Sequence, residues 1–244
     1  MNRVPTPAAG EVHIRFIHLD REPGELARLE RFLSPDERIR AGRLRDRQAR
    51  DRFVAGRGFL RETLAGCLGR EPERLRLAVG EHGKPSLAGE EGSKGLRFSL
   101  SHAEDLAILA VARDCEIGVD LERMRDNVPF RQMAQRFFSP RERDELFTLP
   151  PPLQLPAFFR CWTRKEAYLK GCGTGFSQPS DCFAVTLLPG HPPALMEHLT
   201  SPGEPARWRI VDIAVPDGCC AALAAEGETP VIRCFPWDLY SSSS

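Results

Sequence analysis

The stretch FFRCWTRKEAYLKGCGTG, residues 158–175, predicts an amphipathic helix that ends at Gly171. At 3.6 residues per turn, Glu166 and Lys170 fall on the side of the helix that should face the protein. The apolar residues of that side are Phe159, Trp162 and Leu169. Burying an ion costs several kcal/mol unless a partner or a metal compensates it. The two ions therefore form either a satisfied i,i+4 pair at the edge of the core or part of a functional site.

A repeat in the sequence indicates two similar halves. The segment FLSPDER at 32–38 recurs as FFSPRER at 137–143, with five of seven residues identical. In the first copy, Ser34 as N-cap, Pro35 at N1 and Glu37 predict a helix start with a capping box. About twenty residues beyond each copy, a helical stretch begins, at Phe53 and at Phe159.

In the register of this repeat, Glu166 corresponds to Leu60 and Lys170 to Leu64. The first half is thus expected to hold core leucines where the second half holds ions. This difference makes the charges a specialisation of one half, and it favours a functional site.

The rest of the chain is expected to form strands joined by loops rich in proline and glycine. The predicted strands cover 12–19, 96–101, 106–112, 117–122, 183–187, 208–215, 219–225 and 231–235. Together with the helices they predict an α/β (α+β) fold of two halves, residues 1–114 and 115–244.

Composition excludes several classes of protein. The chain has 244 residues and a formal net charge of zero, so it is long enough for a sizeable core and does not indicate a nucleic-acid partner. No apolar run approaches the roughly 20 residues of a membrane span. The N-terminus lacks the apolar segment of a signal peptide, and the eight cysteines contain no C-x-x-C pair. We expect a cytoplasmic protein with reduced thiols and no membrane partner.

Two carboxylates share one face of the predicted strand 117–122. Asp120 and Glu122 are two residues apart, so both point to the face opposite Val119. Like charges this close are unfavourable unless water or a cation separates them. With Glu166 they supply three oxygen donors, which suit Mg²⁺ better than zinc. Because Mg²⁺ held by few carboxylates usually shares a phosphate with them, a phosphorylated substrate is expected.

These motifs resemble a known family. IGVDLE at 117–122 and WTRKEAYLK at 162–170 look like the signature of the 4′-phosphopantetheinyl transferases, in particular the monomeric type that activates nonribosomal peptide and polyketide synthases. Four flanking motifs agree, and the resemblance covers roughly residues 12–225. They are FLSPDER, GKPSL at 83–87, FSLSH at 98–102 and RFFSPRE at 136–142. The resemblance implies two pseudo-symmetric α/β halves with CoA and Mg²⁺ bound between them.

The resemblance also implies roles for individual residues. It assigns Asp120, Glu122 and Glu166 to Mg²⁺. It assigns Lys170 to the CoA diphosphate and to protonation of the leaving group. Glu142 matches a glutamate that acts through a metal-bound water.

Further positions resemble the family's CoA-binding residues. Ser101 and His102 match phosphate-binding residues, and Lys84 matches a lysine near the 3′-phosphate. Close relatives carry a lysine where this chain has Glu37, so Arg40 and Arg47 are expected to hold the 3′-phosphate instead.

The predicted reaction transfers 4′-phosphopantetheine from CoA to a serine of an apo acyl or peptidyl carrier protein of fatty-acid or secondary-metabolite synthesis, and releases 3′,5′-ADP. The serine's base is either Glu166 or Glu142 through water. The enzyme is expected to be a monomer that recognises its carrier near residues 124–138. Two alternatives are a degenerate module that binds CoA or carrier protein without turnover and a Mg²⁺-dependent phosphohydrolase. Trp162 is expected to be core packing, and His198 to face solvent.

Overall fold

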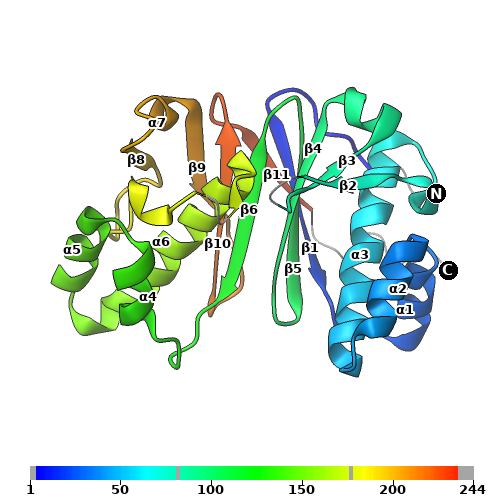
Figure 1. Ribbon diagram of the computed structural model, residues 1–244, viewed down its shortest axis with the longest axis horizontal. Coiled ribbons are helices and arrows are strands. Elements are labelled where there is room, and N and C mark those ends of the chain that lie inside the picture. The colour runs from blue at the N-terminus through cyan, green and yellow to red at the C-terminus, as the bar shows by residue number, and fades with distance from the viewer. Residues whose placement is uncertain (1–3, 81–82, 176–177, 236–244) are drawn as a thin grey trace.

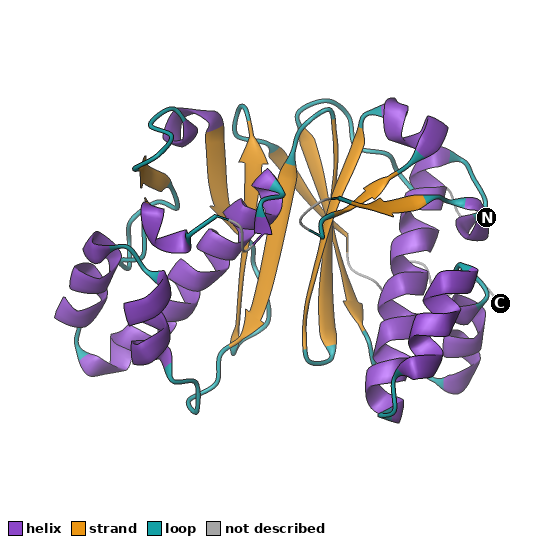
Figure 2. Ribbon diagram, viewed as in Figure 1, coloured by secondary structure: helices purple, strands orange, loops and turns teal. Residues whose placement is uncertain are grey.

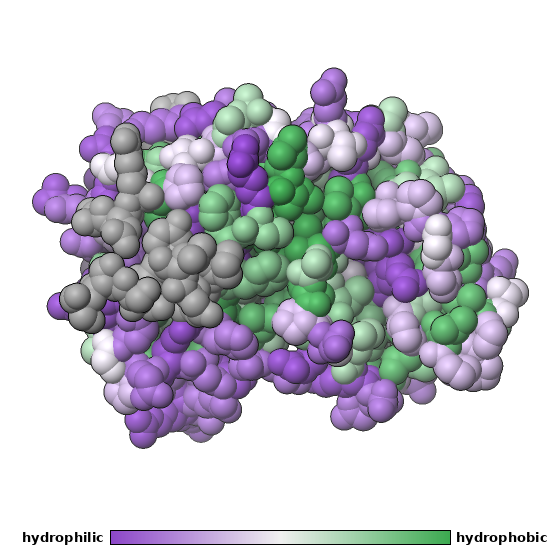
Figure 3. All heavy atoms as spheres, turned by 180° about the vertical axis from the view of Figure 1, so that it is seen from behind, coloured by the Kyte–Doolittle hydropathy of each residue, from purple (hydrophilic) through white to green (hydrophobic). Residues whose placement is uncertain are grey.

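The chain folds into four layers, in which two β-sheets pack face to face between two groups of helices (Figure 1 and Figure 2). This computed structural model describes residues 4–80, 83–175 and 178–235. Apolar side chains from both sheets meet in the space between the sheets, among them Ile14, Ile108, Val119 and Leu223. Seen from behind, apolar surface gathers along the middle of the molecule (Figure 3). The predicted mixed α/β class is confirmed.

The first half places its helices on one face of an antiparallel sheet. Its elements are β1 (Glu11–His18), α1 (Pro23–Glu30), α2 (Pro35–Arg43), α3 (Arg47–Leu68), η1 (Pro72–Arg74), β2 (Leu77–Val79), β3 (Pro85–Leu87), η2 (Gly89–Lys94), β4 (Leu96–Ala103) and β5 (Leu106–Arg113). Helix α3 covers the sheet through a core of leucine, alanine and phenylalanine side chains.

The second half repeats this plan in the same order. Its elements are β6 (Ile117–Arg123), α4 (Phe130–Phe137), α5 (Pro140–Thr148), α6 (Pro151–Cys172), η4 (Ser180–Cys182), β7 (Phe183–Val185), β8 (Leu195–His198), α7 (Glu204–Arg207), β9 (Trp208–Asp212) and β10 (Cys219–Glu226). The strand orders β1-β5-β4 and β6-β10-β9 correspond to each other.

The last strand, β11 (Val231–Phe235), returns to the first half and pairs with β1 in parallel. The sheets change between β5 and β6, near the predicted boundary at 114/115. The C-terminal strand nevertheless belongs to the first sheet, so a simple cut at this position would separate β11 from its partner. The boundary itself stays a prediction.

Helix α6 is longer than the sequence predicted. It begins at Pro151 and ends at Cys172, and the left-handed residue after it is Gly173, with φ of 70°. Gly171 does not end the helix but lies buried inside it. The sequence did not reveal the start of α6, because its prolines suggest a loop. Proline is nevertheless well tolerated in a first helical turn.

The predicted capping box of α2 is present and a second one begins α5, but the predicted register between the halves was wrong by two residues. Helices α3 and α6 each have 22 residues and are followed by a left-handed glycine. Arg61 and Lys165 then take the same place, and each pairs with the capping-box glutamate of its half. In this register Glu166 corresponds to Glu62 and Lys170 to Gly66.

Helix α6 lies directly on strand β6. A Cβ atom on Gly118 would be 2.1 Å from the carbonyl oxygen of Ala167 and 2.2 Å from the amide nitrogen of Gly171. A Cβ atom on Gly171 would be 2.6 Å from the ring of Trp208. Only glycine permits this close approach, which brings the side chains of α6 within reach of those on β6.

Serine side chains join the edges of the two sheets. Strand β4 lies beside β6, and Ser99 Oγ accepts a hydrogen bond of 3.0 Å from the backbone N–H of Val119. Ser101 Oγ accepts one of 3.3 Å from the N–H of Leu121. These hydroxyls satisfy buried backbone donors that a neighbouring strand would otherwise satisfy. We call this contact between β4 and β6 the seam.

We expect Gly118→Ala to destabilise the protein by at least about 2 kcal/mol, because the methyl group would collide with the backbone of α6 rather than with a movable side chain. Gly42→Ala in α2 is the matched control, since nothing lies within 4 Å of its added Cβ. That control should be neutral or stabilising by up to about 1 kcal/mol. Urea unfolding measures both changes, and equal stability of the two variants would contradict the close packing.

Candidate active site

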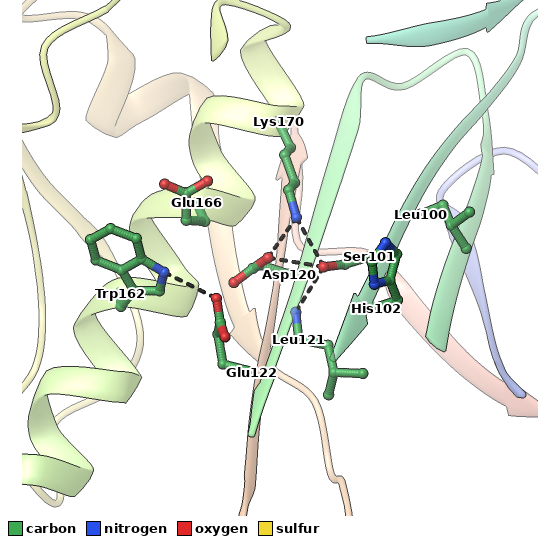
Figure 4. Close-up of a pocket in the computed structure, with 9 residues that line it drawn as sticks. All are labelled: Leu100, Ser101, His102, Asp120, Leu121, Glu122, Trp162, Glu166 and Lys170. Atoms are coloured by element: carbon green, nitrogen blue, oxygen red, sulfur yellow. Dashed lines mark hydrogen bonds and ion pairs between the residues drawn. The ribbon is translucent and has the colours of Figure 1, made fainter. Parts of the chain in front are cut away.

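A pocket of about 280 Å³ opens at the seam, between β4, β6 and α6. Figure 4 shows its polar side chains turned toward one another from these three elements. The lining residues are Leu100, Ser101, His102, Asp120, Leu121, Glu122, Trp162, Glu166 and Lys170. Six of the ten predicted site residues thus lie together: Ser101, His102, Asp120, Glu122, Glu166 and Lys170.

Asp120 lies at the buried end of the pocket and is only 3% exposed. Its Oδ1 atom accepts hydrogen bonds from Lys170 Nζ at 2.5 Å and from Ser101 Oγ at 3.0 Å. Lys170 Nζ also donates to Ser101 Oγ at 2.9 Å (Figure 4). The other oxygen, Asp120 Oδ2, is buried without a hydrogen-bond partner. A buried, unpaired carboxylate oxygen is costly, so it marks a position suited to a cation.

Glu122 is held by a tryptophan. Trp162 Nε1 donates a hydrogen bond of 3.1 Å to Glu122 Oε1. Burial, followed by the charge of Asp120, raises the pKa of the Glu122 carboxyl to about 7. The sequence assigned Trp162 to packing alone. It does pack on Phe137 and Phe158, but its indole N–H also orients a predicted metal ligand.

Glu166 faces the pocket from α6, next to the other two carboxylates (Figure 4). Burial and the nearby Asp120 charge raise its pKa above the usual value. Within the described ranges, no group of three His, Cys, Asp or Glu side chains has the spacing of metal ligands. The predicted metal ligands Asp120, Glu122 and Glu166 therefore share one pocket but do not converge on one point.

The three carboxylates still fit a divalent cation in their chemistry. Oxygen donors without His or Cys suit Mg²⁺. Asp120 Oδ2 is available, and the raised pKa values of Glu122 and Glu166 come partly from mutual repulsion that a cation would relieve. Rotation of the Glu122 and Glu166 side chains would be needed to bring all three carboxylates together.

His102 lines the pocket from the end of β4 and is exposed toward solvent. Although the residue reaches solvent, partial desolvation of its ring inside the pocket and the neighbouring Lys170 charge lower the pKa of His102. A neutral imidazole there can donate one hydrogen bond to an anion that enters the pocket.

Comparison with known proteins identifies the family of this chain. Residues 21–114 match the family profile "4′-phosphopantetheinyl transferase, N-terminal", and residues 116–224 match "4′-phosphopantetheinyl transferase superfamily". The 4′-phosphopantetheinyl transferase HetI of Nostoc sp. is 39% identical over 91% of this chain and 90% of its own. The chain belongs to the 4′-phosphopantetheinyl transferase superfamily. The predictions that it is a member of this family and a transferase are confirmed.

Two other relatives span less of the chain. A putative 4′-phosphopantetheinyl transferase of Synechocystis sp. is 31% identical over 73% of this chain and 71% of its own. A 4′-phosphopantetheinyl transferase of Bacillus subtilis is 30% identical over 70% of this chain and 75% of its own.

No described helix is both long and apolar enough to cross a membrane.

Glu142, a predicted catalytic residue of this phosphopantetheinyl transferase, does not line the pocket. It is 0% exposed and accepts hydrogen bonds from Lys165 Nζ at 2.6 Å and 2.9 Å. It also accepts from the backbone N–H groups of Ser139 and Val185, each at 2.8 Å. With both oxygens occupied in this way, Glu142 fixes helix α5 to α6 and to strand β7.

Three predicted CoA-binding cations also lie outside the pocket. Lys84 Nζ donates to Glu116 Oε2 and to the carbonyl oxygen of Gly171, both at 2.8 Å, and so ties the Gly-Lys-Pro loop to the end of α6. Arg40 lies over the ring of Phe53. The Arg47 side chain is 89% exposed and pairs only loosely, at 3.6 Å, with Asp51.

The prediction that His198 faces solvent was wrong. Its side chain is only 6% exposed, stacks on Phe183, and accepts a hydrogen bond from the backbone N–H of Ser201. This histidine organises the loop after β8 and does not line the pocket.

Glu142→Gln should lower the free energy of unfolding by about 3 kcal/mol or more, because it leaves the Lys165 ammonium buried without a charged partner. Glu166→Gln should change stability by less than about 1 kcal/mol, since Glu166 has no such ion pair and its charge is unfavourable there. Chemical denaturation compares the two variants. If Glu142→Gln is as stable as the wild type, the structural role of Glu142 is excluded. The predicted catalytic role of Glu142 is then again a candidate.

The raised pKa of Glu122 predicts a pH-dependent stability. Because the folded chain holds this proton more tightly than the unfolded chain, the stabilisation is full below pH about 4.5 and is lost as the pH rises to about 7. The slope is at most about 1.4 kcal/mol per pH unit. Melting curves in EDTA between pH 5 and 8 should show this loss in the wild type and less of it in Glu122→Gln. Parallel curves would contradict it.

Proposed function

We propose that this transferase moves the 4′-phosphopantetheine group from coenzyme A to a serine of an apo acyl or peptidyl carrier protein and releases 3′,5′-ADP. The observation that supports the proposal most is the pocket at the seam, where three carboxylates and one ammonium group meet. Opposite charges of this kind suit a diphosphate bound together with a divalent cation. Family membership and the activity for which the relatives are named agree with it.

Asp120, Glu122 and Glu166 would hold Mg²⁺. When bound, Mg²⁺ would offset negative charge on the diphosphate and on the leaving oxygen. Trp162 supports this role, because its hydrogen bond fixes Glu122 and ligand orientation affects metal affinity.

The seryl oxygen forms a bond to the β-phosphorus of CoA, and the bond from that phosphorus to the bridging oxygen of the 5′-phosphate breaks. Lys170 is placed to hold the diphosphate and to give a proton to the departing oxygen, since its ammonium group lies in the pocket. His102 can donate a hydrogen bond at the pocket mouth. Catalysis of this kind depends on positioning and electrostatics.

The proton of the serine needs a base, for which Glu166 and Glu142 were the candidates. The geometry favours Glu166. Its carboxyl lines the pocket and its pKa is raised toward the working pH, whereas both oxygens of Glu142 are occupied in the interior. A base must come within hydrogen-bond reach of the proton that it removes.

We place the carrier protein next to α4 and the loop before it. Partly buried apolar residues gather there, and they would pack against an apolar helix face of a partner: Met124, Val128, Phe130, Met133 and Phe137. We also propose a monomeric enzyme that activates peptide and polyketide synthases; both large sheets beside the pocket belong to one chain, so a second copy is not needed to line it.

An intact-mass measurement on apo carrier protein with CoA, Mg²⁺ and this enzyme tests the proposal. We expect a phosphopantetheine adduct on one serine, no adduct in EDTA, and at least about a hundredfold slower transfer by Asp120→Ala. Arg47→Ala, on an exposed side chain outside the pocket, tests the predicted 3′-phosphate contact through a raised KM for CoA.

Unmodified carriers of acyl, peptidyl and polyketide type would exclude the transfer. CoA binding without turnover would then identify a degenerate binding module. Metal-dependent release of phosphate or 3′,5′-ADP from CoA without a carrier would identify a hydrolase instead.

A further inference from the structure

Lys170 contacts the same carboxylate that the proposed metal needs. Its Nζ atom lies 2.5 Å from Asp120 Oδ1 and 2.9 Å from Ser101 Oγ, and Ser101 Oγ lies 3.0 Å from the same Oδ1. The three atoms form a closed triangle at the buried end of the pocket (Figure 4). The ammonium group therefore acts as a counter-ion of Asp120.

The remaining charges of the pocket do not provide another cation for Asp120. Glu122 and Glu166 face it from β6 and α6, and both are carboxyl groups. The Trp162 N–H reaches Glu122 and not Asp120. Of the described residues that line the pocket, Lys170 is the single lysine or arginine.

An ammonium group on Asp120 Oδ1 opposes a divalent cation in two ways. It occupies one of the donor oxygens, and it repels a second cation only a few ångströms away. Asp120 Oδ2 has no partner, so a cation can approach it, but the approach brings the two positive charges together. A group with two negative charges placed between them would remove this conflict.

Lys170 has the freedom to leave Asp120. Its side chain is 33% exposed, and it has a flexible four-carbon stem, whereas Asp120 is fixed on β6 and 4% exposed in its side chain. An anion at the pocket mouth near His102 can therefore draw the ammonium group outward while Asp120 stays in place.

We propose that Lys170 competes with Mg²⁺ for Asp120, so that a divalent cation binds tightly only together with a diphosphate that draws the ammonium group away. This inference rests on the proposed metal role of Asp120. It adds a second task to Lys170, which sets the order in which metal and diphosphate bind. It also accounts for carboxylates that share a pocket without converging, because one of them is paired with a lysine.

The test measures Mn²⁺ binding by electron paramagnetic resonance on the full chain after EDTA treatment, with Mn²⁺ alone and with Mn²⁺ plus saturating CoA. Lys170→Met removes the charge and keeps the length of the side chain. Lys94→Met is the matched control, since Lys94 is an exposed lysine outside the pocket. Asp120→Asn combined with Lys170→Met reports whether the ion binds at Asp120. Melting curves confirm that each variant is folded, and Lys170→Gln replaces Lys170→Met if it is not.

For the wild type and Lys94→Met we expect weak binding of Mn²⁺ alone and at least about fivefold tighter binding with CoA. For Lys170→Met we expect Mn²⁺ alone to bind at least about fivefold more tightly than to the wild type. CoA should then increase the Mn²⁺ affinity of Lys170→Met by a smaller factor than that of the wild type. Adding Asp120→Asn should remove this gain.

Equal affinities of Lys170→Met and the wild type for Mn²⁺ alone would overturn the competition, even if the wild type modifies carrier protein. A gain that persists with Asp120→Asn would also overturn it, because the ion would then bind elsewhere. If the gain is present and depends on Asp120 but no carrier is modified, the competition stands and the proposed transfer fails. Lack of Mn²⁺ binding by every variant, with and without CoA, would overturn the competition together with the metal site.

Discussion

The contact between Gly118 on β6 and Gly171 in α6 determines where the site lies. At this crossing the helix backbone touches the strand backbone, and no side chain separates them. The strand direction then places Asp120 and Glu122 beyond the crossing, on the face that meets the helix. A helix held farther away by side chains would leave Glu166 and Lys170 out of reach of these carboxylates.

The seam adds the contribution of the first half. Ser99 and Ser101 on β4 satisfy two backbone N–H groups on β6, so the two sheets meet without a regular ladder of backbone hydrogen bonds. Ser101 has a second task, since the same hydroxyl contacts Asp120 and Lys170. One side chain thus fixes the sheet edge and the charged end of the pocket. These two contacts explain why a polar serine occupies a buried position of the strand.

The sequence predicted what local periodicity determines. Alternation along β6 placed Asp120 and Glu122 on one face, and helical spacing turned Glu166 and Lys170 inward, and both expectations agree with the pocket. It could not predict contacts between distant segments. Lys84 donates a hydrogen bond to the carbonyl oxygen of Gly171, 87 positions away, and no local sequence pattern predicts that contact.

The errors in the prediction also have physical causes. The start of α6 was missed because proline carries the same signal in a loop and in a first helical turn. The register between α3 and α6 was wrong because identical residues were matched, whereas the helix ends and the buried partners of the capping glutamates set the true correspondence. Trp162 was assigned to packing because helical periodicity does not reveal what an indole N–H contacts.

The correct register explains why the described residues of the first half do not form a second site of this kind. Strand β1 runs beside β5 as β6 runs beside β10, and Arg15 faces Leu109 where Asp120 faces Ala222. A buried arginine thus stands in the place of the central carboxylate. Gly66 takes the place of Lys170 and lies against Val4, so a lysine does not fit there.

The edges of the two sheets complete this asymmetry. Strand β6 has β10 on one side and reaches β4 on the other only through serine side chains, which leaves room for the pocket. Strand β1 has β5 on one side, but on the other β11 pairs with it through a backbone ladder. A backbone ladder brings strands to within about 5 Å of each other and leaves no space between them. In the part of the chain that the structure describes, the duplicated architecture therefore supplies two large sheets and two long helices but one open seam, and the functional charges of the second half face that seam.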